Sequence, residues 1–373
     1  MNPNPRQVFT ATLAVLAGLA TGYVLLMSMK ILIILLLAII IASAARPLIT
    51  RLMQLRIPSG LAILLIYGGI LLSVLLLGAV ILPPIVNQFA DYLENDWRLA
   101  TRLIIVKNWL QTTLSDLTGQ TVVLADSESI RTATAAFVEN LRITAPNFLG
   151  DLGSVLGEVV LVIVMGIYWL ASRENTIIFI TRLMPLKHQQ DTQAALLEIE
   201  ESMGAYTRGI VFVALFVGIA TFLILLVLRV PNAATYSFII GVTTMLPVVG
   251  GFIGGGLATL LATLGSPLHG LAVLGAFIAV QQVEAHYLTP RTMSRSIGVD
   301  PLLVMVAVFV GFALYGIIGG IIAIPILGTL KVLLREFVIE PHQEVITPYA
   351  IEQGLPVFKA DDTPDIQVAP KTP

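Results

Sequence analysis

A short polar cluster interrupts an apolar segment of the chain and contains side chains that could bind a solute or an ion. The cluster has the sequence QQVEAHY over residues 281–287, so it contains Gln281, Gln282, Glu284 and His286. Residues three apart face the same side of a helix, which places Gln281 and Glu284 together. A carboxylate at membrane depth beside amide side chains could accept a proton or help to bind a cation. These four residues are the first candidates for a substrate or ion path.

The same cluster also has a structural interpretation. Glu284 could lie near a helix end and pair with Arg291 or Arg295, or it could hydrogen-bond another helix. Both arginines form a second rank of candidates together with Asp300 and with Glu158, a carboxylate inside another apolar run. Glu158 is expected near the outer end of its run, where it could simply reach water.

Clusters of proline and glycine interrupt two long apolar stretches near the polar cluster. A proline inside a helix costs about 3 kcal/mol and an interior glycine roughly 1 kcal/mol, so ordinary buried helices do not carry such clusters. Discontinuous helices at membrane depth are typical of transport sites, although small residues spaced by four also favour close helix packing. The candidate helix-break residues are Pro247, Gly250, Gly251, Gly316, Gly319 and Gly320.

Composition identifies the environment of these elements. Hydrophobic residues make up 57% of the 373 residues, charged residues make up 12%, and the mean hydropathy is +0.91. Soluble domains carry about 25% charged residues, so we expect an all-α polytopic membrane protein in contact with the lipid bilayer. The net charge of −2 gives no basic field for nucleic acid. The sequence has no cysteine, no phosphate-binding loop and no His-Glu-x-x-His helix, so we expect neither an enzyme nor a cofactor or metal.

The apolar runs divide the chain into five regions. About eight hydrophobic segments are expected, and the third of them is expected to end at Pro83 and Pro84. The regions are a three-helix membrane part (1–84), an extramembranous part with amphipathic helices (85–151), a fourth membrane helix with a cytoplasmic helical insert (152–208), a transport core with broken helices (209–335) and a disordered cytoplasmic tail (336–373).

Two of the apolar stretches are too long for one untilted crossing. Residues 233–264 would span about 48 Å as one helix, against a hydrocarbon core of about 30 Å. Residues 302–330 are similarly long, and VVGGFIG at 248–254 resembles IIGGIIA at 317–323. We therefore expect two re-entrant helical hairpins that form an inverted repeat, as in many secondary transporters.

Charge placement predicts the orientation. Arginines crowd the connector after the second segment, which places that connector and both termini in the cytoplasm by the positive-inside rule. The loop with Arg291 and Arg295 also lies in the cytoplasm only if both long stretches are hairpins.

The two polar inserts have open interpretations. The amphipathic helices within 85–151 could pack on each other, pack on a neighbouring subunit, or lie in the bilayer interface. In the second insert, one helix face is apolar and the other carries Glu198, Glu200 and Glu201. We interpret that acidic face as solvated in the cytoplasm, with a role in gating an intracellular mouth as the alternative.

Several of these motifs together resemble the autoinducer-2 exporter family. The resemblance rests on PVVG at 247–250, QQVE at 281–284 with Leu288 and Pro290 following, Gly298 with Asp300 and Pro301, and the glycine-rich close of the membrane part. It implies a prokaryotic inner-membrane protein that forms homo-oligomers. The substrates attributed to the family include the furanone autoinducer-2 and, in some members, sodium or lithium exchanged for protons. His286 departs from the family, because many members have another polar residue there.

The leading hypothesis is therefore a secondary exporter of a small polar solute such as autoinducer-2. A sodium (or lithium)/proton antiporter is the first alternative, since Glu284 could supply the titrating carboxylate. A membrane scaffold without transport activity, whose glycines only pack, is the alternative from another class.

Overall fold

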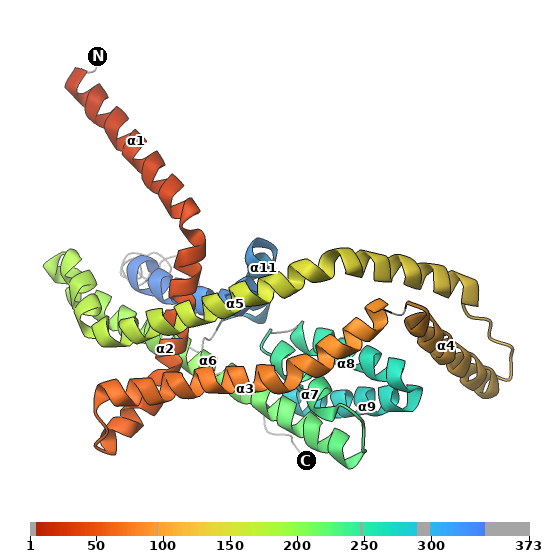
Figure 1. Ribbon diagram of the computed structural model, residues 1–373. Coiled ribbons are helices and arrows are strands. Elements are labelled where there is room, and N and C mark those ends of the chain that lie inside the picture. Colours follow the sequence, from red (N-terminus) through yellow and green to blue (C-terminus); the bar gives the residue numbers. More distant parts are fainter. Residues whose placement is uncertain (1–4, 95, 247–248, 289–298, 340–373) are drawn as a thin grey trace, which may run out of the picture.

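The computed structural model describes residues 5–94, 96–246, 249–288 and 299–339. All regular structure in these residues is helical, as the sequence predicts (Figure 1). The α-helices are α1 (Pro5–Met27), α2 (Met29–Gln54), α3 (Ser59–Glu94), α4 (Asp96–Thr118), α5 (Ser127–Leu183), α6 (Gln189–Val227), α7 (Ala233–Thr243), α8 (Gly250–Gly265), α9 (Pro267–Val283) and α11 (Pro301–Leu334). The short elements are the 3-10 turn η1 (Leu186–His188) and the π-helical turns η2 (Glu284–Leu288) and η3 (Arg335–Ile339).

Six helical segments in the described residues are long and apolar enough to cross a membrane. Many of their large apolar side chains face outward, which suits contact with lipid rather than water. The protein is therefore an all-α polytopic membrane protein. The six segments are Met29–Gln54, Ser59–Ala79, Ser154–Leu183, Leu186–Val227, Pro267–Leu288 and Leu302–Phe337.

The first long apolar stretch folds into two helices that we call hairpin 1 (residues 233–265). Its arms, α7 and α8, pack directly on each other, and glycines allow the close approach. A Cβ at Gly254 would lie 1.8 Å from Thr243 Oγ1, and a Cβ at Gly250 would lie 1.6 Å from the Thr243 carbonyl oxygen. The predicted break between the two halves is confirmed.

The second stretch also folds back, within α11, to form hairpin 2 (residues 302–334). Gly316 has φ +59° and ψ −143°, a conformation that side-chain-bearing residues rarely adopt. Gly311 and Gly319 then meet across the arms, because a Cβ at Gly319 would lie 2.0 Å from the Gly311 carbonyl oxygen. Residues eight apart in a straight helix are about 12 Å apart along its axis, so this contact requires a turn.

Contacts between distant segments agree with hairpins rather than single crossings. α3 and α6 both start from the end of the bundle that carries residues 55–58 and 184–188, here called the connector end. The opposite end carries α4 and is called the insert end. Arg102 of α4 donates a hydrogen bond of 3.2 Å to the Gly265 carbonyl oxygen, so hairpin 1 begins and finishes at the insert end. A single crossing would have placed Gly265 at the connector end.

The helix bounds differ from the sequence-based expectation in two places. The helix of the third segment extends beyond the prolines that were expected to end its apolar span, because α3 continues through Pro83 and Pro84 to Glu94, whereas the apolar span covers Ser59–Ala79. A proline removes one donor and bends a helix, but the hydrogen bonds of the flanking turns remain. In addition, α5 continues without a break across position 151, where the sequence predicted the end of the extramembranous part. Its 57 residues correspond to a helix about 85 Å long.

The largest buried cluster lies where α6 meets hairpin 1 and α9. Val217, Leu225, Ile240 and Val273 are at most 1% exposed there. In the insert, α4 packs on the first part of α5 through Leu99 and Val138, which agrees with mutual packing of its amphipathic helices. This core fixes α9, and therefore the polar cluster, against hairpin 1.

Candidate functional site

The polar cluster lies at the C-terminal end of α9, and its two central members contact each other. Gln281 Nε2 donates a hydrogen bond of 2.8 Å to Glu284 Oε2, as expected for side chains three residues apart. Both residues are half-buried. The α-helix changes to a π-helical turn at Glu284. Turns of this kind are rare overall, but many of those known lie at functional sites. No local sequence pattern predicted this one.

The start of α8 lies directly against the Gln281 side chain. A Cβ at Gly251 would lie 2.5 Å from Gln281 Oε1, so any larger residue here would force the Gln281 amide to shift. Gln281 Oε1 is buried, and no described residue donates a hydrogen bond to it. A buried acceptor, a carboxylate and the first turn of α8 therefore meet at one point, which we call the α8–α9 site (Gly250, Gly251, Gln281 and Glu284).

The two hairpins touch next to this site. A Cβ at Gly320 of hairpin 2 would be 3.4 Å from Leu246 Cδ2, which lies at the turn of hairpin 1. The two helix breaks that resemble each other in sequence are therefore close in space. Gly316 forms the turn of hairpin 2, whereas Gly319 and Gly320 provide the close contacts.

Other sequence-predicted candidates lie apart from the α8–α9 site. Gln282 and His286 are exposed, and His286 Nδ1 lies 2.9 Å from the Gln282 backbone oxygen. Glu158 pairs with Lys30 of α2 at 2.6 Å. Pro247, Arg291 and Arg295 are outside the described residues, so their predicted roles stay predictions.

Asp300 has a structural task at the start of α11. Its Oδ1 accepts a hydrogen bond of 2.8 Å from the Leu302 backbone N–H, which is an N-cap. We expect Asp300→Ala to lower the free energy of unfolding by about 1 kcal/mol, because the cap is lost. Thermal unfolding in detergent would measure this. Asp300→Asn should keep the stability, and a transport defect in a fully stable Asp300→Asn protein would contradict a purely structural role.

A buried ionic cluster at the connector end was not recognised from the sequence. Arg173 Nε donates to both carboxylate oxygens of Glu200, at 2.6 and 2.7 Å, and its Nη2 also donates to Oε2. Arg46 Nη1 lies 3.5 Å from the same Oε2. Glu200 is only 5% exposed, so the prediction of a solvated acidic face was wrong for this residue. Its partners lie 27 and 154 positions away in sequence, which no local pattern reveals.

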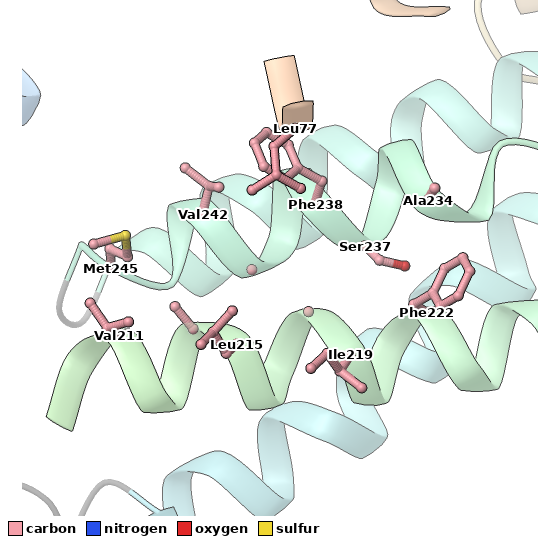
Figure 2. Close-up of a pocket in the computed structure, with 13 residues that line it drawn as sticks. Leu77, Val211, Leu215, Ile219, Phe222, Ala234, Ser237, Phe238, Val242 and Met245 are labelled. Atoms are coloured by element: carbon pink, nitrogen blue, oxygen red, sulfur yellow. The ribbon is translucent and has the colours of Figure 1, made fainter. Parts of the chain in front are cut away.

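An apolar recess beside hairpin 1 is separate from the α8–α9 site. It has a volume of about 400 Å³ and lies between α6 and α7, with Leu77 of α3 above it (Figure 2). Leu215 and Ile219 of α6 face Phe238 and Val242 of α7 across it. Ser237 is its one lining residue with a polar side chain, and that hydroxyl is bonded to the Ala233 carbonyl oxygen at 2.6 Å. The recess therefore offers no free polar group to a polar solute.

Side chains that commonly bind metal ions do not cluster in the described part of the chain. No group of three or more His, Asp or Glu side chains is close enough there to hold a metal ion. The chemical possibilities of the α8–α9 site are hydrogen bonding to a polar solute, coordination of a monovalent cation by oxygen atoms, and protonation of a carboxylate.

Comparison with known proteins gives consistent matches. The model of the AI-2E family transporter matches residues 11–339, which include both hairpins and α9. "Putative transport protein YueF" of Bacillus subtilis (strain 168) is 24% identical over 294 residues, covering 76% of this chain and 78% of that protein. "Putative transport protein MT0215" of Mycobacterium tuberculosis (strain CDC 1551 / Oshkosh) is 27% identical over 271 residues, covering 72% and 69%. A shorter match, to "Putative transport protein YrrI" of Bacillus subtilis (strain 168), is 32% identical over 155 residues, covering 42% and 44%.

Proposed function

Because the chain belongs to the AI-2E transporter family, we propose that it is a secondary carrier that exports a small polar solute through the α8–α9 site. The observation that carries the proposal is the Gln281 side chain. Its amide nitrogen donates a hydrogen bond to Glu284, while its buried carbonyl oxygen lies against the start of α8 without a hydrogen-bond donor among the described residues. A solute hydroxyl can donate a hydrogen bond to that oxygen, and a second hydroxyl of the solute can donate to the Glu284 carboxylate.

The solute class follows from the sparse polarity of the site. Two polar side chains can bind a compact neutral molecule with several hydroxyl groups, such as the furanone autoinducer-2. Broken helices at membrane depth, at the junction of two related hairpins, are the usual setting of such sites in secondary carriers. We place the protein in a prokaryotic inner membrane, with both termini in the cytoplasm and with several copies in the assembly.

Cation/proton antiport is the second candidate, and Glu284 favours it. This carboxylate is half-buried in an apolar helical segment and could alternate between a proton and a sodium or lithium ion. In this case Gln281 Oε1 would supply a neutral oxygen ligand to the ion.

Flux through proteoliposomes separates the candidates. We expect the purified protein to move autoinducer-2 under a proton gradient and Glu284→Gln to reduce that flux at least tenfold, because the amide cannot hold a proton or a charge. Gln282→Asn, an exposed neighbour outside the site, is the matched control. Proton release on adding sodium, without autoinducer-2 flux, would favour antiport. The absence of both fluxes in the parent protein would leave the scaffold as the remaining reading.

The orientation is tested separately by thiol labelling. The chain has no cysteine of its own, so a single cysteine reports unambiguously. We expect Ser294→Cys to resist an impermeant maleimide added outside right-side-out vesicles, whereas Leu117→Cys, 78% exposed on α4, reacts. Reaction of both from outside would contradict the proposed orientation of hairpin 1.

A further inference from the structure

The extramembranous helix α4 reaches back to the hairpin that carries the candidate site. Leu99 of α4, Val138 of α5 and Leu264 of α8 form one buried cluster, with Leu103 packed against it. Beside the cluster, Arg102 Nη1 donates to the Gly265 carbonyl oxygen at 3.2 Å. The insert therefore contacts hairpin 1 at the insert end, where the chain passes from α8 to α9.

Arg102 supplies a hydrogen-bond donor to a backbone carbonyl group at the C-terminal end of α8. The last carbonyl groups of a helix have no partner within it and carry a partial negative charge. The chain leaves the helix at once after Gly265, because Ser266 is extended and Pro267 begins α9. A cationic donor from α4 therefore completes the C-terminus of α8.

The α8 helix connects this contact to the α8–α9 site. Gly265 is fourteen residues from Gly251, or about 21 Å of continuous helix. A displacement of α8 at Gly265 therefore moves Gly251 relative to Gln281 unless α8 bends. Because Gly251 has no space to spare against Gln281 Oε1, a small tilt of α8 changes the site.

We propose that α4 is a lid on hairpin 1, and that Arg102 is the positioning residue through which its docked state holds the site closed at the insert end. The contact is small enough to be released, because among the described residues it consists of a few apolar side chains of an amphipathic helix and one printed hydrogen bond. In the proposed carrier cycle, α4 leaves α8 each time the site opens to the insert end. This step rests on the proposed carrier function, but the docking itself does not.

Hydrogen exchange tests the docking without any substrate. We expect Arg102→Gln to raise amide exchange at least threefold in peptides covering α8 and the following turn, and Arg102→Lys to restore part of the protection. Arg98→Gln, on the same helix, is the matched control and should leave α8 unchanged. Equal exchange in α8 for Arg102→Gln and the parent protein would overturn the lid, whatever the flux results.

Reversible cross-linking tests whether release is required. In the double variant Leu99→Cys/Leu264→Cys, a bifunctional methanethiosulfonate reagent should join α4 to α8, and its reach tolerates more separation than a disulfide. We expect autoinducer-2 or sodium flux, whichever the parent protein shows, to fall at least tenfold and to return after reduction. The single-cysteine variants treated alike are the controls. Unchanged flux in the fully cross-linked protein would show that α4 need not separate from α8 during transport, and it would overturn the lid proposal. A parent protein without flux would overturn the carrier proposal instead, with the exchange experiment still deciding the docking.

Discussion

Replacing Glu200 by alanine should destabilise the protein more than any other single loss of a side chain at the connector end. The Glu200 carboxylate receives three hydrogen bonds from Arg173, whose side chain is 11% exposed. Removing one partner of a buried ion pair leaves an uncompensated charge, at a cost of about 3–5 kcal/mol. We expect a lowered midpoint of thermal unfolding in detergent, together with loss of monodisperse protein.

The neighbouring acid is a matched control for this prediction. Glu201 pairs with Arg208 at 2.8 Å, but its side chain is 66% exposed. Exposed pairs contribute about 0–1 kcal/mol, so Glu201→Ala should leave the unfolding midpoint nearly unchanged. Equal destabilisation by both substitutions would show that Glu200 is not the buried centre of the α2–α5–α6 contact.

Replacing Gly319 by alanine should disrupt hairpin 2. The new methyl group would lie 2.0 Å from the backbone oxygen of Gly311, and a helix backbone cannot yield as a flexible side chain can. Overpacking typically costs about 1–3 kcal/mol, and separating two helix backbones belongs at the upper end of that range. We expect a much lower yield of monodisperse protein on size-exclusion chromatography and loss of transport in the protein that remains.

Gly256→Ala is the control for the glycine substitution. A Cβ at Gly256 meets nothing within 4 Å, and alanine is the better helix former by about 1 kcal/mol. This variant should therefore keep or raise the thermal stability. If Gly319→Ala behaved like Gly256→Ala, the two arms of hairpin 2 would not be in backbone contact.

The sequence was informative wherever the pattern was local. Long apolar runs predicted the membrane helices, because a bilayer leaves few alternatives to a helix for an apolar chain. The excess length of two runs predicted both hairpins, and the spacing of Gln281 and Glu284 predicted their contact. Each of these inferences depends on residues within one helix or one turn.

Contacts between distant segments could not be predicted in the same way. Glu200 is on a helix whose neighbouring acids, Glu198 and Glu201, are exposed, so burial of Glu200 depends on arginines contributed by α2 and α5. The bond from Arg102 to Gly265 joins positions 163 residues apart. At Pro83 and Pro84, the local rule for proline was outweighed by the turns on either side.

The unbroken course of α5 joins the insert end of the bundle to the connector end (Figure 1). Near one end, Val138 packs with Leu99 and Leu264 beneath α4, and near the other, Arg173 holds Glu200. These two attachment points are 35 residues, or about 52 Å, apart along a single helix with no loop between them. Because no loop separates the two attachment points, a tilt of α5 where α4 docks is expected to displace Arg173 in the ionic cluster.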